Sequence, residues 1–132
     1  MKKIGYIPIE ESSLYFSSAD MVVLPYRNVY QSGILFLSYA HSRPVIAANV
    51  GGLPEVVEDG KSGFIVEPDN PEELADKINL AFSPNANLTE MGKYGFQMAN
   101  MKFSWQSAAE KTYNFYNTLL FSSENRQVPY EA

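Results

Sequence analysis

Four short, largely apolar runs that alternate with segments of helical periodicity constrain the fold of this 132-residue chain most strongly. They have strand length, are bounded by proline, glycine or polar turns, and cover residues 3–7, 21–24, 44–48 and 63–66. Continuous apolar runs are typical of strands that are covered on both faces. Strands that alternate with helices predict a parallel sheet with right-handed crossovers, and therefore an α/β fold with flanking helices.

Segments with helical periodicity or helix-start signals lie between and after these runs. They cover 10–19, 32–41, 53–58, 70–81, 87–98 and the chain from 104 onward. The clearest start is at Asn70, an N-cap residue, with Pro71 in the first turn and Glu73 placed to complete a capping box. Gly92 and Gly95 are expected to weaken their helix by roughly 1 kcal/mol each relative to alanine.

The last predicted helix is capped by Ser104 and carries an apolar stripe with helical spacing. The stripe consists of Trp105, Ala108, Thr112, Tyr116 and Leu119. It is most simply interpreted as core. From Ser122 onward the chain is polar and is expected to fray. We therefore assign residues 1–121 to one partial domain and residues 122–132 to a polar tail.

Composition and charge argue against several classes of function. The net charge is -5 and no basic run is longer than Lys2-Lys3, which argues against nonspecific nucleic-acid binding. The chain has no cysteine and one histidine, so a disulfide framework is absent and a zinc site is disfavoured. His41 is accordingly interpreted as a surface or packing residue. The apolar runs are too short to cross a bilayer, and we expect a cytoplasmic protein.

The segment 30–55 combines a turn, a helix, a strand and a second glycine turn in one compact unit. Backbone amides at the start of its helix, around Gln31, Ser32 and Gly33, are unpaired in such a unit and can hold an anion such as a diphosphate. Ser32-Gly33 also fits a plain helix start that needs only a cap. Glu55 follows the second turn and fits either a ligand contact or a partner of the helix dipole.

Two loops of the predicted fold follow neighbouring strands and cover residues 25–33 and 48–55. In an open parallel sheet, ligands bind beyond the carboxyl ends of the strands. We therefore expect both loops to lie at that edge of the sheet and to reach one ligand.

A series of motifs runs through the chain in a defined order. The motifs are GYIP (5–8), ADMVVLPY (19–26), SGILFLSYA (32–40), RPVIA (43–47), GGLPEVVEDGKSGFIV (51–66), PEELADKI (71–78) and FSW (103–105). In this order they resemble the C-terminal half of the group 1 retaining glycosyltransferases of the GT-B architecture, up to about residue 120. The resemblance implies a Rossmann-like domain that binds a UDP-, GDP- or ADP-sugar donor without a cofactor or metal. It also implies an N-terminal acceptor domain and a role in polysaccharide biosynthesis.

The resemblance assigns candidate site residues by position. Gly5, Tyr6 and Ile7 match the stretch whose backbone cradles the nucleobase in relatives. The loop that contacts the donor hexose and diphosphate corresponds to Tyr30, Gln31, Ser32, Gly33, Ile34 and Leu35. Many relatives carry two glutamates eight residues apart, and the second glutamate holds the ribose hydroxyls. The matching positions in this chain are Val29 and Leu37. Neither residue is acidic, so a carboxylate is not expected to recognise the ribose.

The resemblance also shows departures. Two strand-helix units that relatives place before this region, with the basic residues that neutralise the diphosphate, have no counterpart here. Arg27 and Arg43 are candidates for partial compensation, and Glu55 for support. In the usual strand order of such a domain, the two missing strands lie between the strand 3–7 and the strand 21–24. We therefore expect the sheet to rearrange, to lose the strand 3–7 or to be completed by another chain. We also expect the isolated chain not to transfer sugar.

Two other interpretations remain. One is a non-catalytic assembly module whose exposed sheet edge pairs with another copy or with a separate N-terminal chain. The other is a sugar-nucleotide epimerase of the same architecture, which ranks last because the chain lacks the histidine and acidic residues on which such enzymes depend. The resemblance further allows peripheral membrane association of the parent enzyme and an interdomain surface on the last helix.

Overall fold

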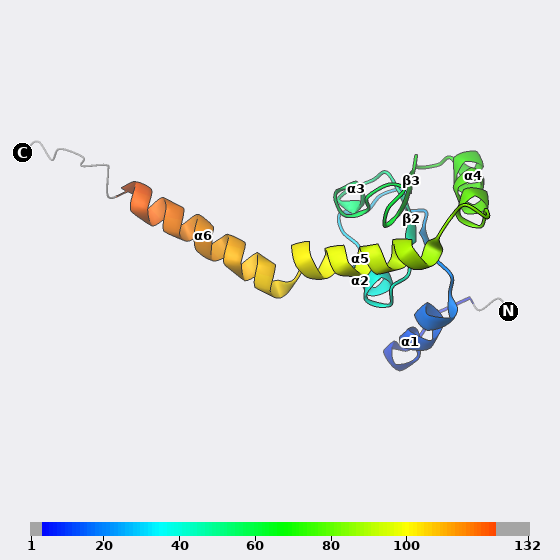
Figure 1. The fold of residues 1–132 in the computed structure, drawn as a ribbon, viewed down its shortest axis with the longest axis horizontal. Coiled ribbons are helices and arrows are strands. Elements are labelled where there is room, and N and C mark those ends of the chain that lie inside the picture. Colours follow the sequence, from blue (N-terminus) through cyan, green and yellow to red (C-terminus); the bar gives the residue numbers. More distant parts are fainter. Residues whose placement is uncertain (1–3, 124–132) are drawn as a thin grey trace, which may run out of the picture. The chain divides into compact units, whose positions relative to one another are not determined.

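The computed structural model describes residues 4–123, and the side chains of residues 4–120. The chain forms two compact units, Met1–Ala99 and Asn100–Ala132. The first unit holds the strands β1 (Val22–Leu24), β2 (Val45–Ala48) and β3 (Gly63–Val66) and the helices α1 (Ile9–Ser18), α2 (Gly33–Ala40), α3 (Leu53–Val56) and α4 (Pro71–Ala81) (Figure 1). Helix α5 (Leu88–Lys102) extends from the first unit into the second, which also holds α6 (Trp105–Ser123). No helix within residues 4–123 has the length and apolar character that a bilayer crossing requires.

A three-stranded parallel sheet in the order β1-β2-β3 forms the centre of the first unit. All four residues of β2 are buried, as expected for a strand with a neighbour on each side. Val45 and Ala47 belong to one apolar cluster and Ile46 to another, because successive side chains of a strand point to opposite faces. The predicted α/β class with a parallel sheet is confirmed.

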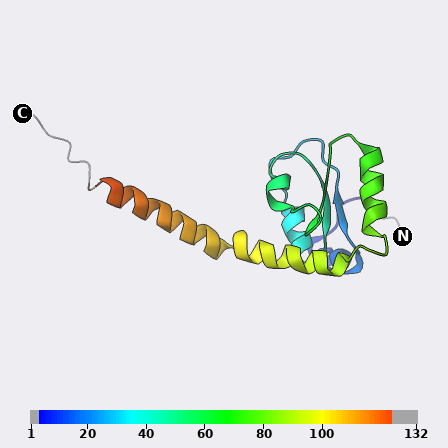
Figure 2. The ribbon, with the colours of Figure 1, turned by 45° about the horizontal axis from the view of Figure 1, so that its top comes forward.

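Helices cover both faces of this sheet (Figure 2). On one face, α2 and α3 bury Leu35, Tyr39 and Leu53. On the other face, α4 packs Ile78 and Ala81 against the second cluster. Burying one large aliphatic side chain stabilises a fold by about 1.5–3 kcal/mol, so these two clusters account for the cohesion of the unit.

The segment before α1 is not a strand, and the prediction of a strand at residues 3–7 is therefore wrong for the described part, residues 4–7. Ile4 and Tyr6 are 82% and 86% exposed. Isolated strands are unstable without a hydrogen-bonded neighbour, and among the described residues β1 pairs only with β2. Three outcomes were expected from the sequence: a rearranged sheet, loss of the first strand, or completion by another chain. The described residues match the second, because residues 4–7 do not form a strand.

Helix α1 is attached to the unit through its last turns. The ring of Phe16 stacks on that of His41 at a centroid distance of 5.5 Å. The Nη2 atom of Arg43 donates a hydrogen bond of 2.7 Å to the carbonyl oxygen of Ser17. The interpretation of His41 as a packing residue is confirmed.

The start of α4 contains a variant of the predicted capping box. The backbone N–H of Glu73 donates to Oδ1 of Asn70 at 3.1 Å, as predicted. The Glu73 carboxylate, however, accepts from the side-chain amide of Asn70 at 3.1 Å and from the backbone N–H of Glu67 at 2.9 Å. The cap therefore also fixes the segment between β3 and α4.

Two glycines let α5 approach the sheet unit closely. A Cβ on Gly92 would overlap the backbone carbonyl of Ser42, and a Cβ on Gly95 would lie 2.5 Å from the ring of Tyr39. Ser42 itself has a φ of 53° in the tight connection to β2. From the sequence these glycines were expected only to weaken their helix, but in the structure they are positions at which α5 packs too closely to admit a side chain.

A buried hydrogen-bond network lies under these contacts. The hydroxyl of Tyr39 donates to Oγ of Ser62 at 2.7 Å, and both residues are fully buried. Oγ of Ser62 also accepts from the backbone N–H of Glu58 at 2.9 Å. Burial raises the pKa of Tyr39 to about 12, more than the hydrogen bond to Ser62 lowers it, and the charge of Glu58 raises it further.

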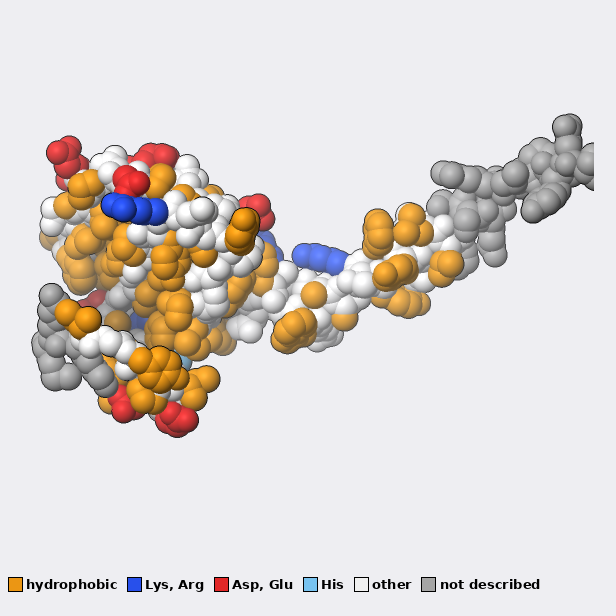
Figure 3. Space-filling model, turned by 180° about the vertical axis from the view of Figure 1, so that it is seen from behind, with side chains coloured by type: hydrophobic (Ala, Val, Ile, Leu, Met, Phe, Trp, Pro, Cys, Tyr) orange, Lys and Arg blue, Asp and Glu red, His pale blue; other side chains and the backbone are white. Residues whose placement is uncertain are grey.

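The second unit contains the predicted last helix. Oγ of Ser104 accepts from the backbone N–H of Ser107 at 3.1 Å, which confirms the predicted cap. The interpretation of its apolar stripe as core is wrong, because Trp105, Tyr116 and Leu119 are 92%, 60% and 49% exposed. Figure 3 shows hydrophobic side chains on the surface of α6. Helical spacing predicted a shared face, but not a partner that covers it. The predicted frayed tail lies, beyond residue 123, outside the described residues.

Candidate functional site

The loops after β1 and β2 lie against each other at the carboxyl ends of the strands. The backbone N–H of Gly52 donates to the carbonyl oxygen of Tyr30 at 2.9 Å. Gly51 has a φ of 55°, and a Cβ there would overlap the carbonyl oxygen of Val29. Glycine is therefore required both for the backbone conformation and for the close approach. The prediction that both loops share this edge is confirmed.

The N-terminus of α2 opens at the same edge. Ser32 is the N-cap residue and is buried, but its side chain makes no capping hydrogen bond. A Cβ placed on Gly33 would meet no atom within 4 Å. The first turn of α2 thus has no side-chain cap from Ser32 and has open space beside Gly33, so a plain side-chain-capped helix start does not describe this arrangement.

The other residues of the predicted hexose and diphosphate loop differ in exposure. Tyr30 is 91% exposed and Ile34 is 43% exposed, so both side chains are accessible. The side chain of Gln31 lies against Gly52 and fills the space between the two loops. Leu35 is buried in the core, which leaves only its backbone for a ligand contact.

Residues at the predicted nucleobase and ribose positions lie together in a second cavity, which is separate from the contact between the two loops. Ile7 and Leu37 line an apolar cavity of about 520 Å³ between α1, β1 and the side of α2, together with Ile34 and Phe16. Gly5 and Tyr6 are exposed beside it, and Gly5 has a φ of 135°. The residues that line this cavity include no carboxylate.

The structure separates the predicted supporting residues. Arg43 precedes β2 and donates to Ser17, so it lies at the amino end of the sheet, opposite the loops described above. The structure therefore does not bring Arg43 together with the other predicted site residues at the carboxyl edge. Glu55 is exposed on the short helix α3, at the carboxyl edge. Arg27 lies in the loop after β1 and remains at the candidate site.

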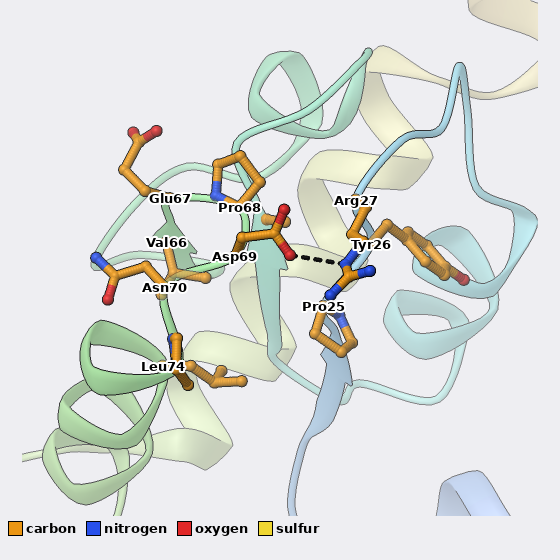
Figure 4. A pocket seen from close by; sticks show the side chains of 11 residues that line it. Pro25, Tyr26, Arg27, Val66, Glu67, Pro68, Asp69, Asn70 and Leu74 are labelled. Carbon is orange, nitrogen blue, oxygen red and sulfur yellow. Dashed lines mark ion pairs between the residues drawn. The ribbon is translucent and has the colours of Figure 1, made fainter.

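A cavity of about 660 Å³ at this edge was not predicted (Figure 4). It is formed by residues 25–27 after β1, Ala48 at the end of β2, residues 66–71 from the end of β3 to the start of α4, and Leu74. Nε of Arg27 and Oδ1 of Asp69 form an ion pair of 2.7 Å across it. The sequence signal was weak, since Asn70 was the one residue of the segment 67–70 to which a role had been assigned, as a helix N-cap.

The cavity contains charges of both signs. Besides Arg27 and Asp69, it is lined by Glu67, whose Oε1 accepts from the side-chain amide of Asn49 at 2.9 Å. Arg27 is the only Lys or Arg in the three loops that follow β1, β2 and β3. Within residues 4–123, no group of three or more histidine or acidic side chains is placed to hold a metal ion.

Comparison with known proteins supports the fold. Sucrose-phosphate synthase from Thermosynechococcus elongatus superimposes with a TM-score of 0.75 at 28% identity, over 90% of this chain and 30% of that one. HepE from Anabaena, in a crystal structure with UDP, superimposes with a TM-score of 0.70 at 21% identity, over 79% of this chain and 29% of that one. HepE has also been crystallised with UDP-glucose.

Sequence comparison supports the family. The D-inositol 3-phosphate glycosyltransferase of Corynebacterium jeikeium is 34% identical over 112 residues, which are 85% of this chain and 26% of that protein. The chain spans about a fifth to a third of the length of the curated relatives it matches. The family model described as "Glycosyl transferases group 1" matches residues 2–83. The chain therefore belongs to the group 1 glycosyltransferases, as its motifs predicted.

Proposed function

We propose that the carboxyl edge of this sheet is the donor-binding portion of a retaining glycosyltransferase that transfers a hexose from a nucleotide-diphosphate sugar. The observation that carries the proposal is the uncapped N-terminus of α2, which opens beside two loops held together by the Gly52–Tyr30 hydrogen bond. Membership of the family supports it. So do the complexes of the HepE structure with UDP and UDP-glucose.

The proposed role of the α2 N-terminus follows from the charge of the leaving group. In such a transfer the nucleoside diphosphate is the leaving group, and negative charge develops on it as the bond to the sugar breaks. Backbone amides at a helix N-terminus, aided by the helix dipole, stabilise that charge without reorganising. Here the amides around Gly33 take this role, and the absence of a side chain on Gly33 lets a phosphate approach them.

The remaining contacts are assigned to neighbouring residues. The backbone of residues 5–7 contacts the nucleobase, while Leu37 gives the ribose an apolar neighbour. Tyr30 is accessible for contact with the hexose. The parent enzyme works on nucleotide sugars in the cytoplasm, in polysaccharide biosynthesis. The 132-residue chain by itself is expected to show no turnover of UDP-glucose, which a coupled assay for released UDP would measure.

A first test uses UDP, GDP and ADP as probes in calorimetric titrations of the purified chain. One of them is expected to bind, and Gly33→Ala is expected to weaken it by about tenfold because the added methyl group fills the space in front of the amides. The fold of this variant should be unaffected, since the methyl group meets no atom. Asn79→Ala, on the exposed side of α4, is the control and should bind normally. Equal affinities for Gly33→Ala and the control would refute the proposed diphosphate contact.

A second candidate function is assembly through the edge of β1. The N–H of Val22 donates to Pro44 at 3.0 Å, so Val22 faces β2 and the backbone of Val23 faces the other way. No strand of the described chain pairs with that side, and the apolar cavity of 520 Å³ lies beside it. Unpaired edges of this kind bind further strands.

Light scattering at several concentrations tests this candidate. If the chain associates through β1, its mean mass should rise with concentration, and Val23→Pro should abolish the rise because proline removes the outward N–H. The matched variant Val22→Pro removes the inward N–H instead and should destabilise the fold. A mass that stays monomeric at all concentrations, or that rises equally in Val23→Pro, would exclude this mode of assembly.

A further inference from the structure

Helix α6 carries a continuous apolar face between residues 105 and 120. At 3.6 residues per turn, the residues of this face fall within about 160° of the helix circumference. The other residues in this range are all polar and include its only two charged residues, Glu110 and Lys111. A stripe of this width is typical of a helix that packs on a partner. The face consists of Trp105, Ala108, Ala109, Thr112, Tyr113, Phe115, Tyr116, Leu119 and Leu120, and all of them are exposed.

Thr112 is the one residue of the face with a hydroxyl group on an aliphatic side chain, and it does not interrupt the face. Its hydroxyl donates a hydrogen bond of 2.8 Å to the carbonyl oxygen of Ala108, one turn earlier. The hydroxyl is therefore satisfied within the helix. A partner can cover it without leaving an unpaired polar group, so the middle of the face is suited to burial.

Small and large residues of the face are arranged symmetrically about Thr112. Ala108 and Ala109 lie four and three residues before it, and Tyr116 and Phe115 lie four and three residues after it. If two copies of α6 pair antiparallel with Thr112 at the centre, each alanine lies opposite an aromatic ring of the other copy. Small residues opposite large ones allow close packing. A parallel pair would instead place ring on ring and alanine on alanine.

The exposed aromatic surface is large enough for such a pair. The side chains of Trp105, Tyr113, Phe115 and Tyr116 are 60–92% exposed. An aromatic side chain buries about 150–250 Å², so four from each copy supply roughly 1,200 Å². Stable and specific interfaces begin at about 1,200 Å². The rings of Phe115 and Tyr116 already contact each other edge to face, with centroids 6.1 Å apart, which limits the side-chain freedom lost on pairing.

We propose that α6 pairs antiparallel with α6 of a second copy of this chain, through the apolar face and with Thr112 at the two-fold axis. Trp105 of one copy lies against Leu119 of the other, and Glu110 and Lys111 stay in water. The pairing does not rest on the proposed donor site, and it uses a surface other than the edge of β1.

Cysteine cross-linking tests this pairing, because the chain has no cysteine of its own. Thr112→Cys is expected to form a disulfide-linked dimer under oxidising conditions, since the two-fold axis brings this position next to its own copy. Asn114→Cys, on the polar side of α6, is the matched control and should not cross-link. Leu119→Cys should not cross-link either, because its two copies in the antiparallel pair lie about 21 Å apart along the helix axis.

Sedimentation equilibrium measures the association itself. The unmodified chain is expected to approach twice its monomer mass as its concentration rises. Tyr116→Lys should raise the dissociation constant at least tenfold, because it replaces an aromatic ring at the centre of the face by a charge. Asn114→Lys adds the same charge on the polar side and should associate normally. Val23→Pro should also associate normally, which separates this pairing from assembly through β1.

Three results would overturn the pairing: a monomer at every concentration, equal association of Tyr116→Lys and Asn114→Lys, or cross-linking of Leu119→Cys as extensive as that of Thr112→Cys. A monomer that co-sediments with phosphatidylcholine vesicles would assign the face to a membrane surface and also overturn it. Failure of the proposed function has a different signature, since the absence of UDP binding leaves the cross-linking of Thr112→Cys unchanged.

Discussion

Replacement of Gly92 by alanine is expected to destabilise the first unit by about 3 kcal/mol, as large overpacking changes do. Helix propensity alone favours the substitution by roughly 1 kcal/mol. The added methyl group, however, would overlap the carbonyl group of Ser42. That carbonyl is backbone in a tight connection where Ser42 has a φ of 53° and its N–H donates to Tyr39 at 2.8 Å. The obstacle cannot rotate away, so the helix or the connection must move.

Urea denaturation followed by circular dichroism measures this effect. The midpoint of Gly92→Ala should fall well below that of the unmodified chain. Gly33→Ala is the matched control, since its methyl group meets no atom within 4 Å, and its unfolding free energy should change by less than about 0.5 kcal/mol. An unchanged or raised midpoint for Gly92→Ala would mean that α5 does not pack on the sheet unit as the structure shows.

The stability of the first unit is expected to fall steeply between pH 10 and pH 12. Tyr39 is fully buried, and its pKa is raised to about 12 from the ordinary value of 10, chiefly by desolvation. Above pH 10 the unfolded chain loses this proton while the folded chain keeps it, so deprotonation favours unfolding. The contribution is complete below pH 10 and is lost as the pH rises through 12. The upward shift of the pKa to about 12 corresponds to a contribution on the order of 3 kcal/mol.

Tyr39→Phe separates this effect from the titration of the exposed tyrosines. At pH 8 the variant should be about 1 kcal/mol less stable, because it loses the hydrogen bond to Oγ of Ser62. Between pH 10 and pH 12 its unfolding free energy, measured by urea titration at each pH, should decline less than that of the unmodified chain. The assignment to Tyr39 fails if both proteins show the same slope.

Local signals in the sequence predicted the elements well where the cause was local. The predicted strand 63–66 has the observed bounds of β3, and Asn70 and Ser104 cap their helices. The paired loops after β1 and β2 were also predictable, because parallel strands place their carboxyl ends at one edge. The motif series, read in order, was specific enough to indicate the family.

Other features depended on contacts between segments far apart in the chain. The run 4–7 has strand-like residues, but no neighbour in the described sheet bonds to it. Arg43 looked equivalent to Arg27 until the strand direction placed it at the opposite end of the sheet. The stripe on α6 has the spacing of a buried face, yet it is exposed.

The sequence by itself therefore determined the α/β class, the helix caps and the edge of the sheet at which the loops after β1 and β2 meet. Periodicity, capping and turn chemistry act over a few residues and are visible in one segment. Only the tertiary structure decided that Gly92 is a contact point and that Arg27 pairs with Asp69 across a cavity. Both facts depend on where two distant backbones come together, and no local pattern encodes that distance.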